Sequence, residues 1–153
     1  MVTRTVLTAE RIDPADLLRE FVARCEGAGA VVSFCGLARG TGAGGSPVSM
    51  LRLEHHPRLT QLSLDRIAGE GAERYEISEA LVVHRWGAIA PGEAIVFVAT
   101  AARHRRAAFL AADYLMDRLK SEAVFWKKEE GIDGGRWIEP SDEDKAALAR
   151  WGR

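Results

Sequence analysis

Two apolar segments separated by one tight turn constrain the fold of this chain more than any other part of its sequence. The segments EALVVHRWGAI (79–89) and EAIVFVATAA (93–102) are dominated by apolar and β-branched residues, as strands are. Between them, Pro91 and Gly92 fill the two central positions of a type II turn, because proline presets the first φ and glycine accepts the positive second φ. The sequence therefore predicts a β-hairpin here.

Three longer segments have the periodicity of helices. In the first, Asp13 is placed to cap the helix and Pro14 to occupy its first position, and the helix should end at the glycines of 27–29. The segment 57–74 also begins with proline and carries leucines at helical spacing. The segment 104–120 is rich in alanine, and one of its faces consists of Ala108, Ala112, Leu115 and Leu119.

Shorter segments are expected to form the remaining strands, at 3–8, 30–39, 48–56, 123–130 and 135–140. The strand at 30–39 is expected to be largely buried, and the last two strands are expected to join at Asp133-Gly134-Gly135. This mixture of helices and strands predicts the α+β class. A chain of 153 residues is most simply one domain, 1–153.

Two segments lie outside this framework. The run GTGAGGSP (40–47) predicts a flexible loop without regular structure, because glycine-rich sequence favours neither helix nor strand. The polar tail, about 141–153, is expected to contain a short helix that starts after Ser141 and has Asp144 at its third position.

The amino-acid composition argues against several classes of protein. With 21 basic and 22 acidic residues the net charge is −1, which argues against a protein whose main task is to bind nucleic acid. Cys25 and Cys35 lack metal-ligand spacing, and we expect two free thiols in a reducing compartment. We find neither a signal-peptide pattern nor an apolar run of membrane-spanning length, so the sequence predicts a cytoplasmic protein without a membrane partner.

Basic residues stand at several expected element ends. Arg39 follows a strand, and His104 and Arg105 open the long helix, where free N–H groups favour an anion. Lys120 lies about 24 Å further along that helix. One copy of the helix therefore cannot bring His104 and Lys120 to the same small ligand. Either they serve different sites, or a symmetric dimer shares them in one pocket.

Alternation along 123–130 places Lys127 on the same face as Phe125 and Glu129, and Lys128 on the other face. If Lys120 turns toward Lys127, the repulsion between the two ammonium groups lowers the pKa of one of them and makes it available as a base or nucleophile. The structural alternative is that the lysine pair protects an edge strand from aggregation.

The sequence gives less support to a metal site, a phosphate-binding loop, a nucleophile elbow or a base-stacking surface. His55 and His56 are adjacent, so on a strand they point in opposite directions, and no third metal ligand is evident. The glycine-rich loop lacks the P-loop pattern, and no nucleophile elbow is present. Phe125 and Trp126 are expected to be core residues rather than base-stacking surfaces. We therefore expect no metal and no cofactor.

An ordered set of motifs resembles the large, catalytic subunit of molybdopterin synthase, the MoaE family. The motifs run from about Gly29 to Glu139, and their combination is specific although no single one is: GAVVSFCGLAR, LRLEHHP, VVHRWGAIAPGEAIVFV, HRRAAF, YLMDRLK, FWKKE and GRWIE. The resemblance implies an α/β hammerhead-type fold with an additional antiparallel β-subdomain.

The resemblance also implies an activity and partners. The family transfers sulfur from the C-terminal Gly-Gly thiocarboxylate of a small, ubiquitin-like subunit of the MoaD type to cyclic pyranopterin monophosphate (precursor Z). The product carries the dithiolene of molybdopterin, in the biosynthesis of the molybdenum cofactor. The large subunits form a homodimer with one small subunit at each end, a heterotetramer, and the substrate pocket draws on both large subunits.

Carried over by motif, the family's roles fall on the basic residues already singled out. Lys120 and Lys127 are implied to be the catalytic lysines. Substrate binding is implied for Leu37, Ala38, Arg39, His104, Arg105, Lys128 and Glu129, with His104 and Arg105 coming from the neighbouring subunit.

The chain departs from the family at several positions. Leu37 stands where lysine is frequent, Val124 where proline is common, and Glu122 where a basic residue can occur; the loop 40–47 is unusually rich in glycine. None of these changes removes Lys120 or Lys127. Two alternative functions stay open: a non-catalytic module that binds a ubiquitin-like partner or a phosphorylated ligand, and a small RNA-binding protein.

Overall fold

The predicted hairpin forms the centre of a four-stranded sheet. The structure, a computed structural model, describes residues 1–132 and 134–152. The sheet has the order β1-β4-β6-β2, with β1 parallel to β4 and the other pairs antiparallel. The turn is confirmed, because the Glu93 N–H donates to the Ala90 carbonyl at 3.1 Å and Gly92 has a φ of 87°. The strands are β1 (Val2–Thr8), β2 (Ala30–Leu37), β4 (Glu79–Arg85) and β6 (Ala94–Ala102).

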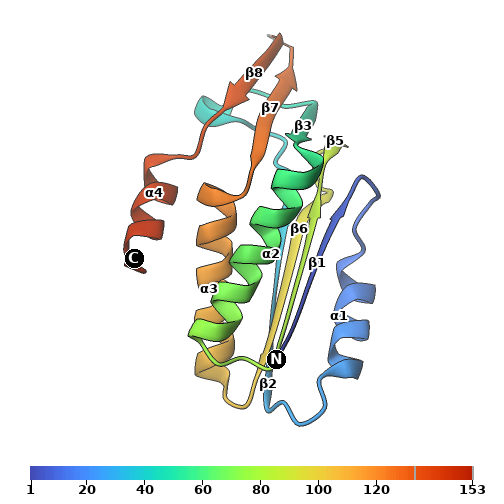
Figure 1. The fold of residues 1–153 in the computed structure, drawn as a ribbon. Helices are drawn as coiled ribbons and strands as arrows, with labels where there is room; N and C mark the ends of the chain where they lie inside the picture. The colour runs from blue at the N-terminus through green and yellow to red at the C-terminus, as the bar shows by residue number, and fades with distance from the viewer. Residues whose placement is uncertain (133, 153) are drawn as a thin grey trace.

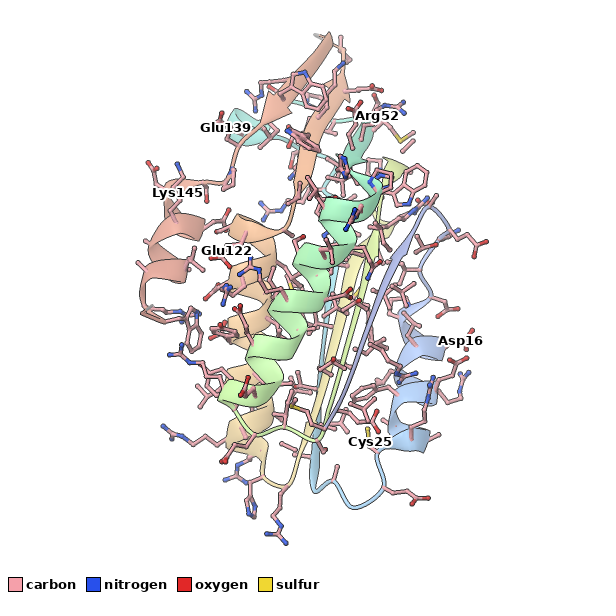
Figure 2. The ribbon with its side chains drawn as sticks, in the orientation of Figure 1. Asp16, Cys25, Arg52, Glu122, Glu139 and Lys145 are labelled. Atoms are coloured by element: carbon pink, nitrogen blue, oxygen red, sulfur yellow. The ribbon has the colours of Figure 1, made fainter. Side chains whose placement is uncertain are left out.

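Helices cover both faces of this first sheet. Helix α1 (Pro14–Arg24) lies on one face, and α2 (Pro57–Arg74) and α3 (Arg105–Glu122) pack side by side on the other (Figure 1). Strand alternation divides the core accordingly: Val82 and Val98 pack with the α2–α3 side, and Leu81 and Phe97 with the α1 side. Figure 2 shows Asp16 on α1 and Cys25 just after its end, on the side of the sheet away from α2 and α3.

A second, antiparallel sheet stands at one end of the molecule, with the order β5-β3-β7-β8. Its strands are β3 (Met50–His55), β5 (Gly87–Ile89), β7 (Phe125–Gly131) and β8 (Gly134–Ile138), and Arg52 of β3 is labelled in Figure 2. The tail forms α4 (Asp142–Ala149), which packs against α3. The expected α+β architecture is confirmed. None of the helices in the described residues is long and apolar enough to cross a membrane.

Several expectations need correction. The segment 79–89 is two strands, because the chain leaves the first sheet at Trp86 and enters the second at Gly87, where φ is 90°. Strand β2 is an edge strand rather than a largely buried one, and it leaves Phe34 41% and Leu37 55% exposed. Trp126 is not a core residue; it is 51% exposed on the outer face of β7.

The ends of elements differ in smaller ways. Helix α1 ends at Arg24, a few residues before the glycines. The loop 40–47 is not without regular structure: it contains a short 3₁₀ turn, η1 (Ala43–Gly45), and the Gly42 N–H donates to the Ser46 carbonyl at 2.8 Å. The expected turn at Asp133 lies outside the described residues.

A buried histidine joins the two sheets. His84, near the end of β4, stacks on Phe125 of β7 with ring centroids 4.0 Å apart, and its Nδ1 lies 3.0 Å from the Arg85 carbonyl oxygen. Burial lowers the pKa of His84 from 6.5 to about 4, because the apolar surroundings disfavour the imidazolium. The ring is therefore neutral in the folded protein at neutral pH.

This histidine predicts a specific loss of stability in mild acid. The unfolded chain protonates His84 below its ordinary pKa of 6.5, whereas the folded chain resists protonation down to about 4, so stability falls as pH drops through this window. Between about pH 7 and about pH 5 the contribution is about 2 kcal/mol. In urea unfolding, His84→Phe should reduce the difference in unfolding free energy between these two pH values by that amount. An unchanged difference would contradict the assignment.

Candidate functional site

The expected lysines come together because α3 ends just before β7 begins. Lys120 lies in the last turn of α3, and the two residues Ala123 and Val124 connect this helix to β7. In β7, Lys127 is paired with Leu53 of β3 and shares its face with Phe125 and Glu129, as alternation predicted. Lys127 is partly buried, whereas Lys120 is more exposed.

The electrostatic surroundings of Lys127 depress its pKa. Burial is the largest cause, since it disfavours the ammonium form; the Glu129 carboxylate acts in the opposite direction. The positive charges of Lys120 and Arg39 lower the pKa further. The repulsion expected from Lys120 is thus present, but it ranks behind burial as a cause.

Arg39 reaches this site from the end of β2. The preceding residue, Ala38, is buried and held by two backbone hydrogen bonds, from its own N–H to the Glu93 carbonyl at 2.9 Å and from the Gly92 N–H to its carbonyl at 2.8 Å. These bonds fix the point from which the exposed Arg39 side chain starts. Leu37, one residue earlier, is exposed at the sheet edge.

Glu129 connects β7, β8 and the glycine-rich loop. Its carboxylate is 3.8 Å from the guanidinium of Arg136, directly opposite on β8, and its side chain is 16% exposed. A Cβ on Gly42 would lie 2.4 Å from Glu129 Oε2, so glycine at this position allows the loop to rest on the carboxylate. Arg136 lies on the Lys127 face of the second sheet and had not been singled out as a site residue.

Lys128 is not brought together with Lys127. It lies on the opposite face of β7, and its ammonium group is 5.6 Å from the centre of the Trp137 ring, a cation–π distance. Trp126 and Trp137, which share this outer face, are both exposed.

Asp144 is a site neighbour that the sequence reasoning missed. Its carboxylate lies 3.5 Å from Lys120 Nζ, and it also forms the expected capping box with Ser141 at the start of α4. Burial favours a raised pKa for Asp144, but the Ser141 hydrogen bonds and the Lys120 charge outweigh it and lower the pKa. The capping pattern predicted α4, yet nothing local in the sequence showed that α4 folds back on α3.

His104 and Arg105 lie at the other end of α3. His104 is the N-terminal cap residue of the helix, Arg105 is its first residue, and both are exposed. Figure 1 shows that this end of α3 is remote from the second sheet. A single chain therefore does not unite these two residues with Lys120, as the helix length of about 24 Å required.

The remaining candidates have structural roles. His55 stacks on Trp86 with ring centroids 4.4 Å apart, and His56 Nδ1 accepts a hydrogen bond from the Leu59 N–H at the start of α2. Within residues 1–132 and 134–152, no three metal-ligating side chains cluster as a metal site requires. Cys25 and Cys35 are free thiols whose pKa values are raised by burial. A surface hollow of about 510 Å³ lies beside Arg103 and the start of β1, and none of the candidate site residues lines it.

The arrangement can bind anions and move a proton. We use the term cationic face for Arg39, Lys120, Lys127 and Arg136 together with the carboxylates of Glu129 and Asp144. The cations outnumber the carboxylates by two, so the face favours anionic ligands. A lysine of lowered pKa can also accept a proton near neutral pH more readily than an ordinary lysine.

Comparison with known proteins gives consistent results. The family model described as MoaE protein matches residues 7–122. A protein of Caulobacter vibrioides named molybdopterin synthase catalytic subunit is 50% identical over 145 residues, which cover 95% of each chain. The solved structure of the MoaE protein from Burkholderia ambifaria matches with a TM-score of 0.82 and 38% identity, covering 100% of this chain and 99% of the other.

A more distant structure shares the fold. It is titled a complex of subunits 1 and 2 of molybdopterin-converting factor from Helicobacter pylori. It matches with a TM-score of 0.68 and 14% identity, over 92% of this chain and 90% of the other.

Proposed function

The chain belongs to the MoaE family of molybdopterin synthase catalytic subunits, and we propose that the cationic face is the centre at which it transfers sulfur. The reaction takes sulfur from the C-terminal thiocarboxylate of a small, ubiquitin-like subunit to cyclic pyranopterin monophosphate and builds the dithiolene of molybdopterin. The observation that carries the placement is Lys127, partly buried beside Lys120 and Arg39 with a lowered pKa.

The chemistry requires positive charge at the meeting point of the reactants. The pterin carries a cyclic phosphate and the donor a thiocarboxylate, so two anions approach each other. The cationic face has two more cations than carboxylates, and this net positive charge offsets the repulsion between the two anionic reactants. Fixed cations also stabilise charge that develops as sulfur attacks and the phosphate ring opens. Lys127, with its lowered pKa, is suited to move a proton in these steps.

The other predicted residues complete this proposal. Arg39 binds substrate, and Leu37 and Ala38 set its position at the end of β2. Glu129 lies against the loop 40–47 at Gly42, and its negative charge limits the repulsion at Lys127. Lys128 lies on the outer face of β7 beside Trp137, so it is outside the cationic face, and its predicted substrate contact has no support from this placement.

The proposal includes two kinds of partner. The small MoaD-type subunit supplies the thiocarboxylate, and a second copy of the chain supplies His104 and Arg105, in a heterotetramer of two large and two small subunits. Exposed apolar side chains on β2 and α3 are suited to contact between copies: Phe34, Leu37 and Phe109. We also place the whole chain, 1–153, in this role as one domain, in the cytoplasm, where its two cysteines stay reduced.

Reconstitution tests the function directly. The purified chain, mixed with a thiocarboxylated small subunit and precursor Z, should produce the dithiolene, whereas a small subunit with an ordinary C-terminal carboxylate should not. Binding of the small subunit without product would favour the non-catalytic module. Affinity for RNA that falls steeply with salt would favour the nucleic-acid alternative.

A further inference from the structure

The connection between α3 and β7 is held by two hydroxyl groups of α2. Thr60 is fully buried and Ser63 nearly so. The Thr60 hydroxyl donates to the Val124 carbonyl at 2.5 Å, and the Val124 N–H donates to the Ser63 hydroxyl at 3.2 Å. Both backbone groups of Val124 are therefore bound to side chains of one helix, which lies beside the connection.

The hydrogen bonding of these hydroxyl groups is complete. Thr60 Oγ1 accepts from the His56 N–H at 2.9 Å while donating to Val124. Ser63 Oγ donates to the Thr60 carbonyl at 2.7 Å while accepting from Val124. Each hydroxyl thus uses its one proton and one acceptor position, which fixes its rotamer and leaves the geometry at Val124 little freedom.

The connection determines how the two lysines face each other. Helix α3 ends at Glu122 with Ala123 as its C-cap, and the pairing of β7 with β3 begins at Phe125, so Val124 belongs neither to the helix nor to the sheet ladder. Next to it, Phe125 is held by its stacking on His84. The hydroxyl groups of α2 therefore hold Val124, midway between Lys120 and Lys127, while the Phe125 N–H donates to the Ala123 carbonyl at 2.9 Å beside it.

We propose that Thr60 and Ser63 are positioning residues for sulfur transfer, because their hydroxyl groups fix the connection at 123–124 and so set the placement of the Lys120 and Lys127 ammonium groups. This inference rests on the proposed function of the two lysines. A displacement of about 1 Å in a reacting group can cost about 100-fold in rate. Hydroxyl groups that touch no reactant can therefore control the reaction.

A matched control separates positioning from simple stability. Thr100 of β6 is also fully buried, and its hydroxyl donates to the Ala108 carbonyl at 2.8 Å. This bond has the same chemistry as that of Thr60, but it acts on the N-terminal part of α3, far along the helix from Lys120. Thr60→Val removes the side-chain donor to the Val124 carbonyl and the acceptor of the His56 N–H, and Thr100→Val removes the side-chain donor to the Ala108 carbonyl, so both should lower the melting temperature.

The experiment compares Thr60→Val, Thr60→Ser, Ser63→Ala and Thr100→Val with the unaltered chain. We expect Thr60→Val to reduce kcat about tenfold or more and Ser63→Ala less, with KM for precursor Z within about threefold. Thr60→Ser keeps the hydroxyl and should restore most of the rate. Thr100→Val acts on the His104 end of α3, so it serves as the control for stability and for the Lys127 titration rather than for kcat. If Thr60→Val does not fold, Ser63→Ala and Thr60→Ser still decide the outcome.

A second readout does not depend on activity. The chain has four lysines, Lys120, Lys127, Lys128 and Lys145, so NMR of the side-chain Nζ groups can follow each titration. Loosening the connection exposes Lys127, and its pKa should rise toward the ordinary lysine value in Thr60→Val but not in Thr100→Val. Unchanged kcat and unchanged Lys127 titration in Thr60→Val would overturn the inference. An inactive unaltered chain would instead refute the proposed function.

Discussion

Lys127→Ala is expected to reduce dithiolene formation by about 10³-fold, and Lys120→Ala by a comparable factor, in single-turnover assays with precursor Z and the thiocarboxylated small subunit. The expectation follows from the position of Lys127 on the inner face of β7, partly buried and close to Lys120 and Arg39. Under the proposed function, its removal eliminates a cation from the point where two anions would meet and also the group suited to move a proton.

A lysine outside the cationic face provides the control, and one result would contradict the catalytic assignment. Lys145 is an exposed lysine of α4, and Lys145→Ala removes the same charge outside the cationic face, so its rate should stay within about twofold of the unaltered chain. Dithiolene formation that survives both Lys120→Ala and Lys127→Ala would refute the catalytic assignment.

The pH dependence of the reaction can distinguish roles for Lys127. If Lys127 accepts a proton, the rate falls as pH drops below its lowered pKa, because the ammonium form has no free electron pair. Lys127→Arg keeps the charge but cannot release a proton near neutral pH. A rate that recovers substantially in Lys127→Arg would show that Lys127 acts through charge alone.

Local sequence signals predicted the elements that depend on local interactions. The Pro91-Gly92 turn, the cap and first residue at Asp13-Pro14, and the capping box at Ser141 and Asp144 are each satisfied within a few residues, and each is confirmed. Alternation in β7 also placed Lys127 correctly with Phe125. These signals work because a turn or cap contains its own hydrogen-bond partners.

Features that depend on distant parts of the chain were not predictable in this way. Strand β2 has the composition of a buried strand, but its place at the sheet edge depends on the order of four strands. The division of 79–89 at Trp86 depends on a second sheet built largely from β3 and β7. The pairing of Lys120 with Asp144 depends on α4 folding back on α3. The family resemblance supplied the roles of the lysines, and these roles stay predictions.

The length of α3 predicts that two chains share one pocket, so a substitution at either end of this helix should greatly reduce activity. Lys120 and His104 occupy opposite ends of one helix, about 24 Å apart, so a pocket that needs both must combine two chains. His104→Ala alone and Lys120→Ala alone should each be nearly inactive, because in a symmetric dimer every pocket then lacks one group.

Mixing the two variants should restore activity, because a hybrid dimer of a His104→Ala chain and a Lys120→Ala chain contains one pocket in which both groups are intact. Random exchange makes half the dimers hybrids with one intact pocket each, so recovery should approach about one quarter of the unaltered activity. The measurement is the initial rate of dithiolene formation after the variants are mixed and subunit exchange is confirmed by mass spectrometry.

Two variants that affect the same end, Lys120→Ala and Lys127→Ala, provide the control: each hybrid pocket then lacks one lysine, and mixing should restore nothing. Recovery in the first mixture alone requires that the pocket is shared, whereas no recovery after confirmed exchange would mean that His104 and Lys120 serve separate sites.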